Sequence, residues 1–326
     1  MVAEPNHPAW RWAQWLGLLA TVALLVGLLR RPEPTLNLLW NGIIPVLPAV
    51  FLVNPLLWRN VCPLATLTTL SGDRMGTRTL DGGMVRATLV LGALLLVVLV
   101  SGRRVVFNTD GPMLASVIVL VGGLAVAGGT RYQRKAGFCN SICPVLPVER
   151  LYGQAPLLRV ANARCPTCIR CTLRGCIDRS PADATRTAIG ARASSPSWLH
   201  SPYGWFAAGF PGFITGYFTI GNSGWSGAPA LLLHVGTAIG VSLAVTMLLV
   251  HGLRLSAAVA LPILASAAVG LYYWFASAAI AEAWGLAPAA TWSLRGAAAA
   301  LIGWWLVHAL RPRARRRTEP PRGAPA

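Results

Sequence analysis

Long apolar runs separated by short polar segments dominate the chain. A window of about 19 residues selects eight candidate membrane-spanning helices, at residues 12–29, 37–57, 85–101, 112–130, 203–222, 228–250, 256–278 and 291–310. Pro45 and Pro48 lie inside the second run, so we expect that helix to be kinked or broken. The fifth run is rich in glycine and aromatic residues and gives the weakest signal. The pattern predicts an all-α integral membrane protein.

The polar segments divide the chain into four parts. Residues 1–130 carry the first four predicted helices, and residues 203–310 carry the last four. Residues 131–202 form a polar, cysteine-rich segment and a linker rich in small residues and proline. Residues 311–326 form a basic, proline-rich tail, which we expect to be disordered on the anionic membrane surface. We therefore predict one soluble module between two sets of membrane helices.

Charge refines this prediction. Only 12% of the residues are charged, against about 25% in soluble domains. The net charge is +18, but the basic residues lie between the apolar runs and in the tail, so we predict contact with membrane lipid and none with nucleic acid. With a cytoplasmic N-terminus, one side of the membrane carries 23 of the 28 Lys and Arg residues. The positive-inside rule thus predicts a multi-pass protein of a bacterial inner membrane with both termini in the cytoplasm.

The seven cysteines all fall on that cytoplasmic side, where thiols stay reduced and metal ligation is favoured over disulfides. Four of them form the run "CPTCIRCTLRGC", with the spacing Cys165-x2-Cys168-x2-Cys171-x4-Cys176. A bacterial [4Fe–4S] site uses Cys-x2-Cys-x2-Cys-x3-Cys-Pro, whereas a structural zinc site uses two separated Cys-x2-Cys pairs. Because the first three cysteines match the iron–sulfur spacing, we predict that this run binds a [4Fe–4S] cluster.

The sequence leaves two candidates for the fourth ligand of this cluster. The last gap is four residues long, and Ile177 stands where the iron–sulfur motif has proline. The simplest interpretation is that Cys176 closes its own cluster. The rival ligand is Cys143, which Pro144 follows.

Two more cysteine segments resemble the membrane-bound ferredoxin-like proteins of the NapH/NosR type. In "GFCNSICP", Cys139 and Cys143 match that family's Cys-x3-Cys-Pro motif, whereas "WRNVCP" retains only Cys62 and Pro63, because Trp58 replaces the first cysteine. The resemblance covers roughly residues 40 to 180. It implies a transmembrane bundle with a cytoplasmic, ferredoxin-like iron–sulfur module. It also implies electron transfer between membrane quinone and a partner redox protein, or electron supply for the maturation of one.

Cys62, Cys139 and Cys143 have two interpretations. They are either structural ends of helices or a second redox or metal site beneath the bundle. Three thiolates are an incomplete set for a four-iron cluster, so a second cluster would need another kind of ligand or a three-iron form.

The main functional hypothesis is a membrane-bound iron–sulfur electron carrier that exchanges electrons between quinone or quinol and a partner redox protein. The alternative is a metal- or redox-sensing protein, or a metalloenzyme-assembly protein, without sustained electron flow. With ten Asp and Glu residues and no nucleotide-binding loop, the chain fits a carrier, or a subunit of a quinol-linked oxidoreductase, better than an independent enzyme. We do not expect haem, because His234, His251 and His308 lie near predicted helix ends, where histidine is typically an interfacial group.

Overall fold

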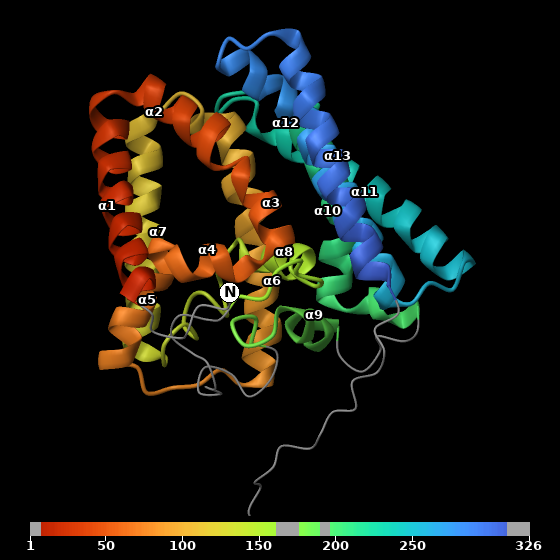
Figure 1. Ribbon diagram of the computed structural model, residues 1–326, viewed down its shortest axis with the longest axis horizontal. Helices are drawn as coiled ribbons and strands as arrows, with labels where there is room; N and C mark the ends of the chain where they lie inside the picture. Colours follow the sequence, from red (N-terminus) through yellow and green to blue (C-terminus); the bar gives the residue numbers. More distant parts are fainter. Residues whose placement is uncertain (1–7, 161–175, 190–195, 312–326) are drawn as a thin grey trace, which may run out of the picture.

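The computed structural model describes residues 8–160, 176–189 and 196–311. Within these ranges the chain consists of helices and turns, with one isolated β-bridge between Arg78 and Tyr132 (Figure 1). The predicted tail lies outside the described residues apart from Arg311. The all-α fold agrees with the prediction from the sequence.

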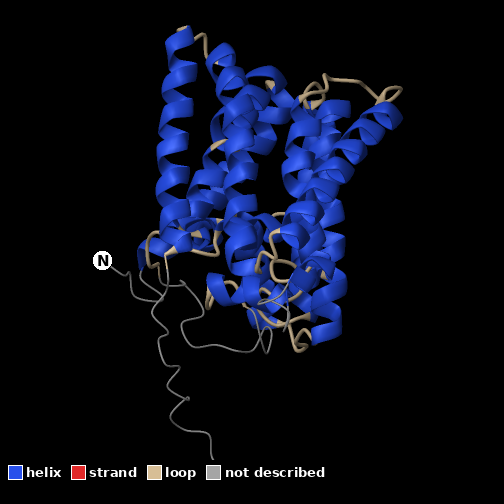
Figure 2. Ribbon diagram, turned by 90° about the vertical axis from the view of Figure 1, so that its right-hand side faces the viewer, coloured by secondary structure: helices blue, strands red, loops and turns tan. Residues whose placement is uncertain are grey.

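The long helices make up the body of the molecule, and several of the short helices gather at one end of it (Figures 1 and 2). The long elements are α1 (Pro8–Arg30), α6 (Gly82–Gly102), α7 (Gly111–Arg131), α10 (Pro202–Phe218), α11 (Ala228–Gly252), α12 (Ala257–Ala283) and α13 (Pro288–Leu310). The short ones are α2 (Pro32–Leu38), α3 (Val46–Val53), α4 (Pro55–Val61), α5 (Pro63–Arg74), α8 (Leu146–Tyr152), α9 (Pro181–Ile189) and three non-α segments, η1 (Leu39–Ile43), η2 (Arg103–Phe107) and η4 (Pro196–His200).

Seven helical stretches within the described residues are long and apolar enough to cross a membrane. They are Pro8–Arg30, Pro32–Val53, Gly83–Phe107, Gly111–Arg131, Ala228–Gly252, Ala257–Ala283 and Pro288–Leu310. The second is broken as predicted, because α2 passes into the π-helical segment η1 and then, past Pro45, into α3. These seven stretches correspond to seven of the eight predicted spans.

The remaining predicted span, residues 203–222, forms the 17-residue helix α10, which is not among those seven. Most side chains of α10 are buried, and α11 and α12 pack against it. A Cβ atom at Gly209 would lie 2.9 Å from the Ile239 side chain, so glycine permits the close approach of α10 and α11. Its glycine content therefore reflects packing inside the protein, and α10 is better described as a buried central helix than as a lipid-facing span.

The turns that connect the helices lie at two ends of the molecule. At one end, the Asn108 side chain donates a hydrogen bond to Asn222 (2.7 Å) and Trp284 Nε1 donates to the carbonyl of Asn41 (3.1 Å). At the other end, Trp198 Nε1 donates to the carbonyl of Leu255 (3.1 Å), which joins the start of α10 to the turn after α11. Helices α4, α5, α8 and α9 lie at this second end, which is called the cysteine end below.

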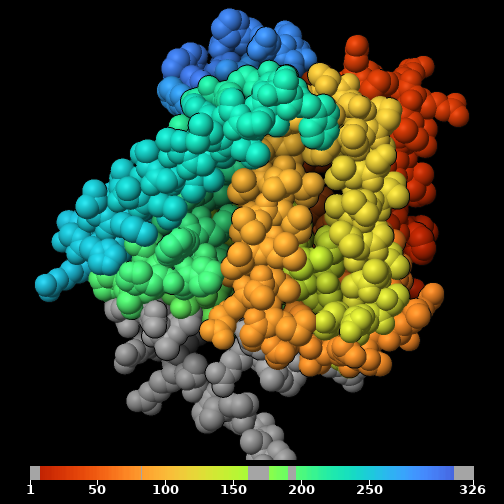
Figure 3. All heavy atoms as spheres, turned by 180° about the vertical axis from the view of Figure 1, so that it is seen from behind, coloured from red at the N-terminus to blue at the C-terminus, as the bar shows by residue number. Residues whose placement is uncertain are grey.

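Both the start of α1 and the end of α13 lie at the cysteine end (Figures 1 and 2). Seen from behind, α6 and α7 stand as separate columns between the first helices and the group α10–α12 (Figure 3). The short helices α4, α5, α8 and α9 lie at the cysteine end of these columns (Figure 1). The candidate site is built from these short helices and the loops between them.

Candidate functional site

Only one cysteine of the predicted cluster run is described. Cys165, Cys168 and Cys171 lie outside the described residues, so their role as ligands stays a prediction. Cys176 begins the segment that turns into α9 through backbone hydrogen bonds from Arg179 and Ser180 to its carbonyl (3.2 and 3.1 Å). The structure therefore describes only the last residue of the predicted cysteine run.

The other three cysteines lie together at the cysteine end. Cys62 joins α4 to α5, which begins at Pro63. Cys139 and Cys143 lie on a loop of tight turns after α7, where the Cys143 amide donates to the Phe138 carbonyl (3.0 Å). All three side chains belong to one apolar cluster around Phe138, and Cys139 is only 3% exposed. Residues 77 positions apart in the sequence thus share one apolar environment.

Burial controls the chemistry of these thiols. It raises the pKa of Cys62 and of Cys143, and it raises the pKa of Cys139 to about 12. Without a metal, all three are protonated at neutral pH and behave as small apolar side chains. No group of three or more His, Cys, Asp or Glu side chains in the described ranges is arranged to hold a metal ion. The three thiols share one apolar cluster, and their role as a second redox or metal site stays a prediction.

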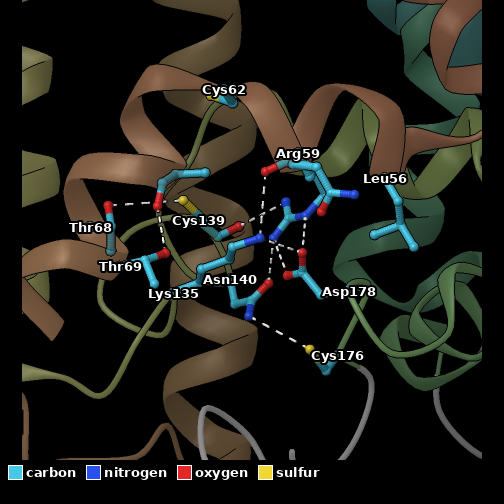
Figure 4. A network of polar contacts seen from close by, with 12 residues as sticks. Leu56, Arg59, Cys62, Thr68, Thr69, Lys135, Cys139, Asn140, Cys176 and Asp178 are labelled. Atoms are coloured by element: carbon cyan, nitrogen blue, oxygen red, sulfur yellow. Dashed lines mark hydrogen bonds and ion pairs between the residues drawn. The ribbon is translucent and has the colours of Figure 1, made fainter. Parts of the chain in front are cut away.

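A network of buried charges lies beside the cysteines (Figure 4). The Arg59 guanidinium donates to both carboxylate oxygens of Asp178, from Nε to Oδ1 (3.1 Å) and from Nη2 to Oδ2 (2.7 Å). Its Nη1 also donates to Oε2 of Glu149 (2.6 Å). Lys135 Nζ donates to Oδ1 of Asp178 (2.7 Å). Each of these side chains is at most 4% exposed, so all the ion pairs form away from water.

The two carboxylates respond differently to burial. Burial alone favours the neutral acid, but Arg59 and Lys135 together outweigh it and hold the pKa of Asp178 well below its usual range. Glu149 has only one arginine contact, so burial prevails and raises its pKa. Burial lowers the pKa of Lys135, but the charge of Asp178 overcomes this effect and leaves it raised. Asp178 is thus the fixed anion of the network.

Among the described residues, buried cations outnumber buried carboxylates by one. Five charged residues are buried among the described residues, namely Arg59, Lys135, Glu149, Arg150 and Asp178. Arg150 is 4% exposed, and its Nε has no hydrogen-bond partner in the described part of the chain. Burial lowers the pKa of Arg150, and the charge of Arg59 lowers it further, whereas Tyr203 and, to a smaller extent, Cys176 and Glu149 raise it. The excess positive charge therefore lies at the same end of the molecule as Cys176.

The charge network also joins the cysteine-bearing segments to one another. Arg59 lies three residues before Cys62 and donates a long hydrogen bond to the Cys139 carbonyl (3.4 Å). Asn140 accepts from Arg59 Nη2 (2.8 Å) and places its Nδ2 3.8 Å from the Cys176 Sγ. Three distant parts of the chain are thereby held at one point, as Figure 4 shows.

Sequence reasoning missed this network. It assigned the basic residues to membrane topology, and it assigned no role to Asp178 or Glu149. The available signal was the rarity of acids: two of the ten Asp and Glu residues stand next to cysteine motifs, in "CPVLPVER" and "GCIDR". The partners of these acids could not be read from the sequence, because Arg59 and Asp178 are 119 residues apart.

Comparison with known proteins identifies no relative. The chain matches no protein-family model, no curated protein and no solved structure.

Proposed function

We propose that the protein is a membrane-bound iron–sulfur electron carrier in which Cys165, Cys168, Cys171 and Cys176 hold one [4Fe–4S] cluster. The cluster would exchange electrons between membrane quinone or quinol and a partner redox protein. Cys176 is the proposed fourth ligand in preference to Cys143. When bound, the cluster supplies the one-electron chemistry, and the chain supplies ligands, position and electrostatics.

The cysteine spacing carries this proposal, and the excess of buried positive charge at the cysteine end supports it. An uncompensated buried charge costs several kcal/mol, on the order of 3–5, so an anion is expected close to Arg150. Residues 161–175 contain no Asp or Glu, and the two buried carboxylates already pair with Arg59 and Lys135. Thiolates of an anionic cluster would provide the missing negative charge.

The choice of Cys176 rests on how it is held. Asp178, two residues later, is bound by Arg59 and Lys135, and Ile177 between them is fully buried. Cys143 instead lies between two apolar clusters, in contact with the surroundings of Phe138 and of Ile177. Burial and the charge of Asp178 raise the pKa of the Cys176 thiol, and Arg59 only partly offsets them. The preference for Cys176 therefore rests on its firmly held position and its place in the cysteine run.

The orientation is part of the proposal. The basic residues assigned to the cytoplasm by the positive-inside rule, so far as they are described, lie at the cysteine end, whereas Arg30, Arg103 and Arg295 lie towards the other end. We infer that the cysteine end faces the cytoplasm of a bacterial inner membrane. The reducing cytoplasm would keep the ligand thiols available for a cluster.

Anaerobic purification in detergent tests the proposal. We expect about four iron and four sulfide per chain, and an EPR signal after reduction by dithionite. Cys176→Ser should abolish this signal, whereas Cys143→Ser should retain it. Loss of the cluster in the Cys143 variant alone would reverse the assignment of the fourth ligand, and a colourless protein with one zinc would refute the cluster.

A second measurement separates electron transfer from sensing or assembly. A quinol analogue is added anaerobically to the oxidised protein, and reduction of the cluster is followed by its absorbance and EPR signal. Reduction by quinol, with reoxidation by quinone, is expected of a carrier. A cluster that is stable but inert to both would favour the sensing or assembly role.

A further inference from the structure

Two exposed histidines lie side by side at the cysteine end, apart from the charge network. His200 is the last residue of η4, and His251 lies in the last turn of α11. Their ring centroids are 5.8 Å apart, with the ring planes inclined by 59°. The sequence places them 51 residues apart, so only the packing of α10 against α11 brings them together.

The backbone that carries the two histidines is firmly held. Trp198 and Leu199, directly before His200, are fully buried, and Trp198 Nε1 donates to the Leu255 carbonyl (3.1 Å). Ser201, directly after it, caps α10 by accepting from the Gly204 amide (3.0 Å). On the other side, the Leu255 amide donates to the Val250 carbonyl (2.9 Å), which fixes the turn after His251. The two histidines thus lie on η4 and on the end of α11, and the hydrogen bond from Trp198 to Leu255 joins η4 to the turn after α11.

The hydrogen bond of His251 leaves one ring nitrogen for a ligand. Nδ1 lies 3.0 Å from the carbonyl of Met247, which can only accept, so Nδ1 carries the proton. The lone pair of the neutral ring is therefore on Nε2. A histidine whose other nitrogen donates to a backbone carbonyl is the usual form of a metal ligand.

The separation of the rings fits one shared ion. Imidazole nitrogens bind zinc at about 2.0–2.1 Å, which places two ring centres roughly 5–6 Å apart on a tetrahedral ion. The observed 5.8 Å is within that range. Both side chains are exposed, which leaves their torsion angles free to adjust to an ion.

We propose that His200 and His251 form a binding site for a borderline transition-metal ion such as Zn²⁺, Co²⁺, Ni²⁺ or Cu²⁺. Imidazole ligands suit these ions, whereas Mg²⁺ and Ca²⁺ require oxygen ligands. With two protein ligands, the ion keeps coordination positions open to water or an external ligand. The site is independent of the proposed cluster and its cysteines.

Titration with Co²⁺ tests the site in the full-length, cluster-loaded protein, purified anaerobically with a tag that contains no histidine. Histidine-bound Co²⁺ gives weak visible bands, whereas a cysteine ligand adds an intense near-ultraviolet charge-transfer band, so the spectrum distinguishes the two. The variants are His200→Gln and His251→Gln, and the matched controls are His234→Gln and His308→Gln, which alter histidines on α11 and α13 outside the pair.

We expect one Co²⁺ per chain without a thiolate band, with affinity reduced about tenfold or more in each of the two site variants. The control variants should bind as the wild type does. Equal binding by wild type and both site variants would overturn the proposal, as would a bound ion that shows thiolate charge transfer. Retention of the cluster spectrum in every variant shows that the fold is intact.

Discussion

Arg59 is the residue on which the candidate site depends most. Its guanidinium uses Nε, Nη1 and Nη2 to bind Asp178, Glu149 and Asn140 at once, which the planar fork of arginine permits and the point charge of lysine does not. The side chain is 3% exposed, so no water replaces these contacts. Removing it would leave two buried carboxylates with Lys135 as the remaining ion-pair partner of one of them.

Arg59→Met should therefore destabilise the protein by about 3–5 kcal/mol, the cost of breaking a buried ion pair from one side. The measurement is thermal unfolding in detergent, followed by circular dichroism. The control is Arg186→Met, because Arg186 is 64% exposed and contacts Asp183 at 3.5 Å on the surface of α9. We expect the control to change stability by less than about 1 kcal/mol; equal effects would show that the buried network is not stabilising.

Arg150 gives a separate test of the charge argument. If it compensates an anionic cluster near Cys176, Arg150→Gln should lower the midpoint potential of the cluster, because the reduced and more negative form loses a nearby cation. Arg150→Lys should retain most of the wild-type potential. The measurement is a redox titration monitored by EPR, and identical potentials in all three proteins would refute the electrostatic role of Arg150.

At the scale of elements, close backbone contacts position the cysteine loop. A Cβ atom at Gly128, near the end of α7, would lie 2.7 Å from the carbonyl oxygen of Gly137, two residues before Cys139. The helix and the loop therefore meet backbone to backbone, and no larger residue fits without displacing the loop. On the same helix, a Cβ atom at Gly122 would meet no atom within 4 Å.

This contrast predicts opposite results for two chemically identical substitutions. Gly128→Ala should destabilise the protein by about 1–3 kcal/mol through overpacking. Gly122→Ala should be neutral or stabilising by up to about 1 kcal/mol, because alanine favours the helix. Thermal unfolding measures both effects, and iron content reports whether the loop is displaced. A neutral Gly128 variant would show that the loop adjusts freely.

At the scale of the whole molecule, the helices place the chain turns at two opposite ends. The segment around Thr79 lies at the cysteine end, where Arg78 pairs with Tyr132 after α7. The segment around Ser226 lies at the other end, where the Ser223 amide donates to the Arg104 carbonyl (3.0 Å). Because α10 runs from one end to the other, the chain segments at its two ends lie on opposite sides of the membrane in the proposed orientation.

Labelling of single introduced cysteines tests this topology. In intact spheroplasts, a membrane-impermeant maleimide should modify Ser226→Cys but not Thr79→Cys, since both positions are exposed but the inner membrane separates them. Thr79→Cys should react once the membrane is opened, and the wild type controls for native cysteines. The reverse pattern would invert the orientation, and labelling of both from outside would contradict the spanning arrangement.

The apolar runs predicted seven of the long helical stretches and the break at Pro45, because each depends on residues close together in the sequence. The same runs did not distinguish α10, whose apolar side chains face other helices, from a lipid-facing span. Hydropathy measures how apolar a segment is, and lipid and protein interior are apolar alike.

The sequence by itself determined the helical class, the order of the helices, and the cysteine spacing on which the iron–sulfur proposal rests. Only the tertiary structure decided which charges are buried and paired, that Cys62 lies in one cluster with Cys139, and that His200 lies beside His251. The reason is physical. Periodicity and spacing report on neighbours along the chain, whereas an ion pair between Arg59 and Asp178 depends on how helices far apart in sequence pack together.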